Sequence, residues 1–296
     1  MLTGRKLAFV GGDARQIEVI AQTTELDASA TLIGFEELPR RFTDTALVTL
    51  STEVFADVDA VVLPVAGMDD DGRVETRFSG EGHVVLTEDH FAAMKPETFV
   101  FTGIARPRLA DWCRKYPVNL VKLMELDEVA ILNSIPTAEG AIALAMQHTD
   151  ITVHGARALV LGFGRCGKTL ARTLDALGAK VTVAARRPAD LARVREMGLQ
   201  PVHMGALLEA VADVEMVFNT IPDMILSAAV LSQMAKDCVI IDIASKPGGT
   251  DFRYAERRGM TAMLAPSLPG LVAPKTAGRI IADSVCRILA ESRPVS

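Results

Sequence analysis

Residues 158–187, ALVLGFGRCGKTLARTLDALGAKVTVAARR, decide how the second half of this chain folds. The stretch contains four apolar residues, the pattern Gly162-x-Gly164-x-x-Gly167, an amphipathic segment and a second apolar segment over residues 180–184. A strand, a glycine-rich turn, a helix and a second strand in this order are typical of a dinucleotide-binding βαβ unit. A plain structural turn is the alternative, and the strand and helix patterns around the glycines favour the dinucleotide site.

Each glycine of this pattern has a separate physical role. The first permits the tight turn, the second lets a pyrophosphate approach the backbone, and the third lets helix and strand pack closely. The helix then begins with free N–H groups and the positive end of its dipole, which attract phosphate. We therefore predict that the pyrophosphate is lined by Gly162, Phe163, Gly164, Arg165, Cys166 and Gly167.

The end of the second strand indicates which dinucleotide binds. Domains that prefer NAD usually have an acidic residue there, which binds the ribose hydroxyls. This chain has Ala184, Ala185, Arg186 and Arg187 instead, and two guanidinium groups can pair with a 2′-phosphate. We predict NADP as the cofactor, with NAD as the second possibility. Under the alternative interpretation, the two arginines are solvated charges that open the helix at Pro188.

Composition and charge restrict the class of protein. A length of 296 residues suits two domains, and a hydrophobic content of 49% is ample for two buried cores. The net charge of −6 argues against nucleic acid or an anionic membrane as partner, and no uninterrupted apolar run reaches the ~20 residues that span a bilayer. The N-terminus shows no secretion signal, and the four cysteines form no ligand cluster with the five histidines. We expect a cytoplasmic protein with reduced thiols and no metal site.

Apolar segments alternate with helical patterns through the second half of the chain. Strand candidates lie near residues 158–161, 180–184, 200–203, 214–219, 238–243 and 261–264. Alternating strands and helices with short connections predict a parallel sheet with helices on both faces. The predicted fold class is α/β, with two Rossmann-like domains, each a doubly wound parallel sheet, and an interdomain cleft for the substrate.

The first half of the chain repeats this pattern more loosely. A strand over residues 6–10 and a helix over residues 16–25 flank the turn GGDAR, which lacks the full glycine fingerprint. Residues 67–90 are predicted to form a loop or hairpin. This half is therefore expected to be a second, smaller α/β domain.

The predicted boundaries follow from these patterns. We expect an N-terminal domain over residues 1–130 and a nucleotide-binding domain over residues 131–275. A turn at residues 133–136 and a linking helix over residues 132–148 join them, and the helix over residues 276–296 packs back onto the first domain.

Polar residues follow two neighbouring strands of the predicted second sheet. Ligands in such sheets bind at the carboxyl ends of the strands. The segment expected to border a ribose of the cofactor is Asn219, Thr220, Ile221 and Pro222, for which a simple turn is the alternative. The next strand ends at Ala244, Ser245 and Lys246, which are expected to approach the nicotinamide.

Seven motifs spread over nearly the whole chain resemble the family formed by the A subunits of bacterial dipicolinate synthase. They are GGDARQ at residues 11–16, FTG at 101–103, NSIPTAEGA at 133–141, GFGRCG at 162–167, NTIP at 219–222, DIASKPGG at 242–249 and PSLPG at 266–270. The NSIPTAEG run is far more distinctive than the glycine fingerprint.

This resemblance implies a specific activity. Members of the family oxidise a dihydrodipicolinate-type ring from the lysine pathway to dipicolinate, with a nicotinamide cofactor, in the mother-cell cytoplasm of sporulating bacteria. The resemblance also implies that the partner is a second, flavoprotein-like subunit. We further expect a homo-oligomer, whose size the sequence does not define.

A ring with two carboxylates requires Arg, Lys or a helix N-terminus to bind it. Ser134 is predicted to be an N-cap with Thr137 three residues on, and pure capping is the alternative. Arg15, Lys246 and Lys275 are the further candidates, and both Arg15 and Lys275 have a surface charge as the alternative.

No catalytic base is assigned from the sequence. His83 and His90 lie in the predicted loop, and Glu139 fits the preference of acidic residues for the first turn of a helix. Another NADP-dependent 2-hydroxyacid or amino-acid dehydrogenase is the nearest alternative function, but no His lies in the motif regions. A non-catalytic NADP(H)-binding subunit of a complex is the alternative from a different class.

Overall fold

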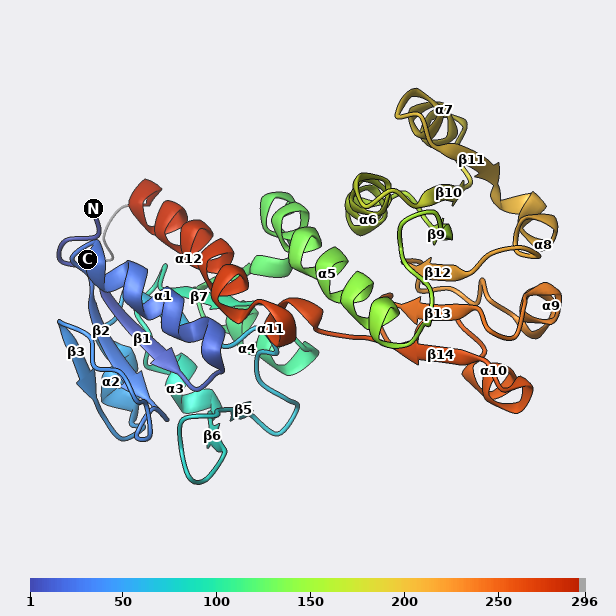
Figure 1. The fold of residues 1–296 in the computed structure, drawn as a ribbon. Coiled ribbons are helices and arrows are strands. Elements are labelled where there is room, and N and C mark those ends of the chain that lie inside the picture. Colours follow the sequence, from blue (N-terminus) through green and yellow to red (C-terminus); the bar gives the residue numbers. More distant parts are fainter. Residues whose placement is uncertain (293–296) are drawn as a thin grey trace. The chain divides into compact units, whose positions relative to one another are not determined.

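The computed structural model describes residues 1–292, which form two compact units, each built around a six-stranded sheet (Figure 1). The first unit contains residues 1–130 together with the helix that begins at Pro274, and the second contains Ile131–Ala273. Every pairing within the two large sheets is parallel. The predicted class, α/β with two parallel sheets, is confirmed.

The sheet of the first unit has the strand order β3-β2-β1-β4-β7-β8. Its strands are β1 (Lys6–Val10), β2 (Ser29–Ile33), β3 (Thr45–Leu47), β4 (Ala60–Val62), β7 (Phe99–Thr102) and β8 (Asn119–Lys122). Its helices are α1 (Ala14–Glu25), α2 (Thr52–Ala56), α3 (Glu88–Ala92), α4 (Pro107–Lys115), the 3₁₀ turn Leu123–Glu125, and α12 (Pro274–Glu291).

The second sheet has the equivalent order, β11-β10-β9-β12-β13-β14. Its strands are β9 (Arg157–Leu161), β10 (Lys180–Ala185), β11 (Gln200–His203), β12 (Met216–Asn219), β13 (Val239–Asp242) and β14 (Thr261–Leu264). Its helices are α6 (Arg165–Ala176), α7 (Pro188–Glu196), the 3₁₀ turn Met204–Ala206, α8 (Leu207–Ala210), α9 (Ala228–Gln233), α10 (Phe252–Arg258) and α11 (Leu268–Val272). In both sheets the chain reverses its direction of winding between the third and fourth strands, which is where doubly wound folds bind ligands.

Both sheets have apolar cores on their two faces because their central strands are apolar on both sides. In β9, Ala158 and Val160 pack into one cluster while Leu159 and Leu161 pack into another. All four side chains have relative exposures of 1% or less. The near-continuous apolar run read from the sequence is therefore the mark of a strand covered by helices on both faces.

Helix α12 packs along α1 in the first unit, as the red and blue helices of Figure 1 show. The two helices come closest at Gly278, where an added Cβ would lie 2.5 Å from the carbonyl oxygen of Arg15. The apolar side of α12 contributes Ile281 and Val285 to the same core as Val19 of α1. The last helix of the chain is thus part of the core of the first unit.

Helix α5 (Asp127–Gln147) is longer than the sequence pattern predicts. It begins in front of the predicted turn at residues 133–136, so the prediction of a turn there is wrong, and Pro136 lies inside the helix. By length and composition α5 could cross a membrane. Its buried residues Ala138 and Ala141 belong to the core of the second unit, which accounts for its apolar character.

A buried arginine ties the end of α12 to the first sheet. Arg5 is 4% exposed, its Nη1 lies 3.3 Å from Asp59 Oδ1, and its Nη2 donates to the carbonyl of Leu289 at 2.8 Å. Removing one partner of a buried ion pair leaves an uncompensated charge and typically costs several kcal/mol.

We predict that Arg5→Met lowers the free energy of unfolding by about 3 kcal/mol, because it leaves Asp59 buried without its guanidinium. Arg287→Met is the matched control, since it removes pairs with Glu128 and Glu291 that are about half exposed. We expect the control to change stability by about 1 kcal/mol or less. Thermal unfolding followed by circular dichroism measures both, and equal effects would contradict a special contribution of the buried pair.

Candidate functional site

A cavity of about 260 Å³ lies at the carboxyl ends of β9, β10 and β12 in the second unit. This edge is where the winding of the sheet reverses, since β9 is hydrogen-bonded to both β10 and β12. The residues that line the cavity are Gly162, Phe163, Gly164, Ala185, Arg186, Arg187, Asp190, Met204, Thr220, Ile221 and Pro222. The cavity therefore brings together the glycine turn, the two arginines and the end of β12.

The three glycines of the fingerprint are required for three different reasons. Gly162 has a φ of +94°, and a Cβ there would lie 2.5 Å from Thr220 Oγ1. At Gly167 a Cβ would lie 2.2 Å from the carbonyl oxygen of Gly162, so α6 could not pack so closely on the turn. A Cβ at Gly164 would meet nothing within 4 Å. The second glycine thus keeps space open beside the helix start, where a pyrophosphate needs close backbone approach.

The start of α6 has the properties of a phosphate site. Gly164 is its N-cap and supplies no side chain, and its carbonyl accepts from Lys168 N at 3.0 Å. The first turn of α6 contains no acidic residue. Backbone N–H groups that precede the first intrahelical bond, with the dipole of a twelve-residue helix, favour an anion here.

Cys166 lies in this first turn and is half-buried. Burial raises the pKa of its thiol, and the neighbouring charge of Arg165 opposes this only in part. The thiol is therefore protonated at neutral pH and adds no negative charge to the phosphate site. The other three cysteines, at 113, 238 and 286, are free and buried.

The end of β12 is shaped by side-chain hydrogen bonds. Asn219 is fully buried, its Nδ2 donates to the carbonyl of Ile221 at 3.0 Å, and its Oδ1 accepts from Ile221 N at 3.1 Å. Thr220 Oγ1 donates to the carbonyl of Leu161 at 2.8 Å. Asn219 consequently holds the loop in shape, while Thr220, Ile221 and Pro222 form the cavity wall.

The loop after β13 is anchored by Asp242, which sequence reasoning did not single out as a site residue. Its fully buried carboxylate accepts from Ala244 N at 3.1 Å, Gly249 N at 2.8 Å and Thr250 Oγ1 at 2.7 Å. Ala244 is buried, whereas Ser245 and Lys246 are exposed on this loop. None of the three lines the cavity described above.

Gly249 joins this loop to the one that follows β12. A Cβ on Gly249 would lie 2.3 Å from the carbonyl oxygen of Asp223, so only glycine fits between the two loops. The carbonyl of Gly249 accepts from Ile225 N at 3.0 Å and from Leu226 N at 2.9 Å. The wall of the cavity is thus braced by the neighbouring strand end.

Arg186 and Arg187 differ in their surroundings although both line the cavity and both are exposed. Arg187 Nε and Nη2 donate to the two carboxylate oxygens of Asp190 at 2.7 and 2.9 Å. Within residues 1–292 Arg186 has no ion pair. Asp190 is a cavity residue that the sequence analysis missed, and the three-residue spacing from Arg187 on α7 is the signal that could have found it.

Two predicted substrate residues occupy other positions than expected. The predicted N-cap at Ser134 is wrong, because the acidic residues Asp127 and Glu128 already start the helix. Ser134 Oγ donates to the carbonyl of Ile131 at 2.6 Å and lies 2.6 Å from Thr169 Oγ1. Thr137 Oγ1 likewise donates to the carbonyl of Asn133 at 2.7 Å. Both hydroxyls therefore bond to carbonyls of their own helix instead of marking a free N-terminus.

The remaining basic candidates lie in the first unit. Arg15 is held by Asp13, the N-cap of α1, with Nη2 to Oδ2 at 2.6 Å. Burial alone would raise the pKa of Asp13, but hydrogen bonds and charge from Arg15, with Arg77 nearby, hold it below its usual value. Lys275 is exposed in the first turn of α12 and lines a polar cavity of about 370 Å³.

The two histidines of the first unit have structural surroundings. His90 is buried, and its Nδ1 accepts from Thr87 N at 2.9 Å at the start of α3. His83 lies in the antiparallel hairpin of β5 (Arg73–Glu75) and β6 (His83–Val85), with Nδ1 3.0 Å from the carbonyl of Glu81. Neither geometry assigns a catalytic base.

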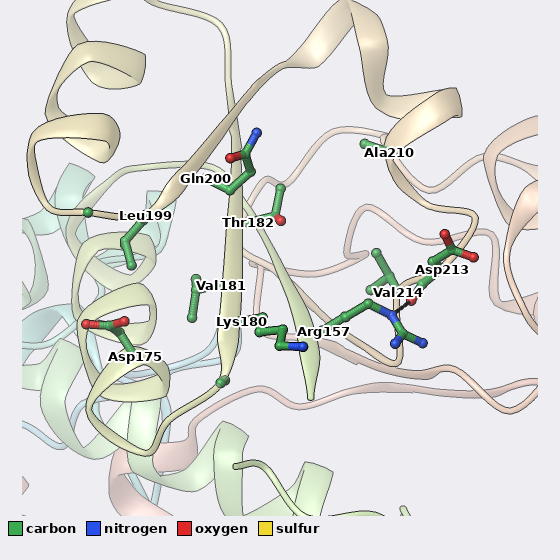
Figure 2. Close-up of a pocket in the computed structure, with 12 residues that line it drawn as sticks. Arg157, Asp175, Lys180, Val181, Thr182, Leu199, Gln200, Ala210, Asp213 and Val214 are labelled. Atoms are coloured by element: carbon green, nitrogen blue, oxygen red, sulfur yellow. Dashed lines mark hydrogen bonds between the residues drawn. The ribbon is translucent and has the colours of Figure 1, made fainter. Parts of the chain in front are cut away.

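A larger cavity of about 490 Å³ in the second unit lies at the opposite ends of the strands (Figure 2). Its lining includes Arg157, Lys180 and Gln200, the first residues of β9, β10 and β11. Figure 2 shows Arg157 beside Asp213, and Arg157 also pairs with Glu215 at 3.2 Å. Ligands of doubly wound sheets bind at the carboxyl ends, so this cavity is not the nucleotide site despite its size.

The two units match two different families of protein domains. Residues 6–124 match the N-terminal domain of the dipicolinate synthase A subunit, and residues 137–246 match the D-isomer specific 2-hydroxyacid dehydrogenase NAD binding domain. The dipicolinate synthase A subunit of Bacillus subtilis (strain 168) is 50% identical over 291 residues, which are 98% of each chain. This chain belongs to the dipicolinate synthase A subunit family. The resemblance found in the seven sequence motifs is thus confirmed.

Solved structures of this family have the same fold. The A subunit structure from Bacillus halodurans is 47% identical with a TM-score of 0.94, covering 99% of this chain and 100% of that one. The structure from Bacillus subtilis is 49% identical with a TM-score of 0.93, covering 98% and 97%. An L-alanine dehydrogenase, 14% identical with a TM-score of 0.63 over 95% and 89%, shares the fold alone. The dehydrogenase-type second unit makes this member of the family a nicotinamide-dependent oxidoreductase.

We predict opposite outcomes for alanine at two glycines of the fingerprint. Gly164→Ala keeps the stability of the fold, since its Cβ meets nothing, but weakens dinucleotide binding about tenfold by blocking backbone approach. Gly167→Ala lowers the free energy of unfolding by about 1–3 kcal/mol, because its Cβ collides with Gly162. Thermal unfolding and calorimetric titration with NADPH separate the two. Unchanged affinity in Gly164→Ala would contradict a pyrophosphate at this position.

Proposed function

We propose that this chain oxidises dihydrodipicolinate to dipicolinate with NADP⁺ during spore formation. The observation that carries the proposal is the 50% identity, over 98% of each chain, to a protein named as the A subunit of dipicolinate synthase. Such identity across the whole chain extends over both units and over every motif at the carboxyl ends of the strands. The open glycine turn and the cavity beside it support a dinucleotide as the cofactor.

The overall reaction balances as dihydrodipicolinate plus NADP⁺ giving dipicolinate, NADPH and a proton. The nicotinamide, when bound, accepts the hydride that leaves the ring. The residues of the chain hold and orient the reactants, and formation of an aromatic ring drives the oxidation. We propose that the first turn of α6 holds the pyrophosphate, with Gly162, Phe163, Gly164, Arg165, Cys166 and Gly167 around it.

The substrate carries two carboxylates, which basic side chains would bind. Lys246 is the candidate in the second unit, exposed on the loop that Asp242 anchors one strand beyond β12. Arg15 and Lys275 are the candidates in the first unit, and Arg15 would have to exchange its pair with Asp13 for the substrate. Asn219, Thr220, Ile221 and Pro222 are proposed to border a ribose, and Ala244 and Ser245 the nicotinamide.

The choice of NADP over NAD rests on the end of β10. The cavity there contains Arg186 without an ion pair in the described part of the chain, and no acidic residue directly follows the strand. A free guanidinium suits a 2′-phosphate, which it can bind with two parallel hydrogen bonds. NAD remains the alternative cofactor.

The letter in the name of the Bacillus subtilis relative marks that protein as one part of an assembly. We propose that this chain likewise acts with a second, flavoprotein-like subunit in the mother-cell cytoplasm, and that it forms a homo-oligomer. The proposed partners include neither nucleic acid nor membrane, consistent with the net charge of −6.

The proposal is tested by turnover of the purified chain without its partner subunit. The chain is mixed with NADP⁺ or NAD⁺ and a lysine-pathway intermediate that a second enzyme generates freshly. We expect reduced nicotinamide and dipicolinate absorbance to rise in equal amounts, faster with NADP⁺. Binding of NADPH without any dipicolinate would contradict a catalytic role and leave the chain as a cofactor-binding subunit.

We predict that Arg186→Gln weakens NADPH binding about tenfold and leaves NADH binding nearly unchanged, because it removes a charged donor to the 2′-phosphate. Arg193→Gln is the matched control, an exposed arginine of α7 that does not line the cavity. Calorimetric titration of each variant with both cofactors measures the effect. Equal loss of affinity for NADPH and NADH would contradict a phosphate contact by Arg186.

A further inference from the structure

The cavity at the end of β10 contains an acidic side chain among its basic ones. Asp190 lies on α7 and lines the same cavity as Arg186, Gly164 and Thr220. Its side chain is 15% exposed, whereas that of Arg187, which it binds, is 74% exposed. The carboxylate is therefore part of the wall, and the guanidinium lies on its solvent side.

The pair between Asp190 and Arg187 uses both carboxylate oxygens and two guanidinium nitrogens. The two distances, 2.7 and 2.9 Å, are those of a bidentate charge-assisted pair. This is the same fork that a phosphate group would use on an arginine. In the structure Asp190 thus takes the position at Arg187 that an external anion would otherwise take.

A second pair on the same helix shows that this arrangement is not a general property of α7. Arg193 and Glu196 have the same three-residue spacing, with Nη1 to Oε2 at 2.8 Å. Both of their side chains are more than half exposed, and neither lines the cavity. Of the two pairs, only the one with Asp190 places a carboxylate where the adenosine end of a dinucleotide would bind.

We propose that Asp190 is a specificity-determining residue that limits the preference of this site for NADP over NAD. The inference rests on the proposed use of this cavity for the dinucleotide. The 2′-phosphate of NADP meets one available guanidinium, Arg186, and must compete with Asp190 for the second, Arg187. A neutral ribose hydroxyl of NAD suffers no repulsion from the same carboxylate, which can accept a hydrogen bond from it. The site therefore admits both cofactors, with NADP favoured less than two arginines alone would favour it.

The test is a set of variants titrated with NADPH and NADH in the full chain. Asp190→Asn keeps the shape of the side chain and removes its charge, so Arg187 becomes available to the phosphate. We expect NADPH affinity to rise about fivefold while NADH affinity changes less than about twofold, the scale of an exposed ion pair. Glu196→Gln is the matched control and should change neither affinity.

The double variant separates repulsion from loss of structure. Arg187→Gln leaves Asp190 uncompensated and should weaken NADPH binding, and Asp190→Asn added to it should restore most of that affinity. A purely structural role of the pair would instead lower both affinities together in every variant.

Each outcome distinguishes this inference from the proposed function. If Asp190→Asn changes the NADPH-to-NADH ratio no more than Glu196→Gln, or lowers it, the role of Asp190 is wrong. If Arg186→Gln leaves NADPH affinity unchanged, the proposed cofactor site is wrong irrespective of Asp190. If the unaltered chain binds neither cofactor, both proposals fall together.

Discussion

The second unit depends on how closely α6 approaches the end of β9. Only the hydrogen of a glycine fits between them, since a Cβ on Gly167 would lie 2.2 Å from the oxygen of Gly162. This approach sets the start of α6 directly at the strand end, so the N–H groups of its first turn face the cavity side of the turn. The same constraint leaves the position of Gly164 open. Fold and phosphate site are thus one piece of geometry.

The first unit repeats the sheet order but uses the same edge differently. A Cβ at Gly11 would lie 2.8 Å from the carbonyl of Glu75, and Gly12 is hydrogen-bonded to Glu75 and Arg77 of the hairpin region. Thr76 Oγ1 also donates to the carbonyl of Gly34 at 2.7 Å, at the end of β2. The hairpin therefore fills the edge that the second unit keeps open. The looser glycine pattern of the first half is explained by this packing.

The sequence could predict what depends on short-range constraints. The glycine spacing, the apolar strands and the residues at the end of β12 all follow from local rules, and they agree with the strand order and the cavity. The start of α5 is predicted wrongly because Ser134 followed by Pro136 reads as a helix start. The structure instead satisfies the Ser134 hydroxyl within the helix and against Thr169 of α6, a contact 35 residues away that no local pattern reveals. The cavity position of Asp190 depends on how α7 packs, so the sequence could show only its spacing from Arg187.

The cofactor site is tested most directly by a crystal structure of the chain grown with NADP⁺. We predict the pyrophosphate against the first turn of α6, beside Gly164, and the 2′-phosphate within hydrogen-bond distance of Arg186. Electron density for the dinucleotide at any other edge of the second sheet, or a 2′-phosphate turned away from Arg186, would contradict this geometry.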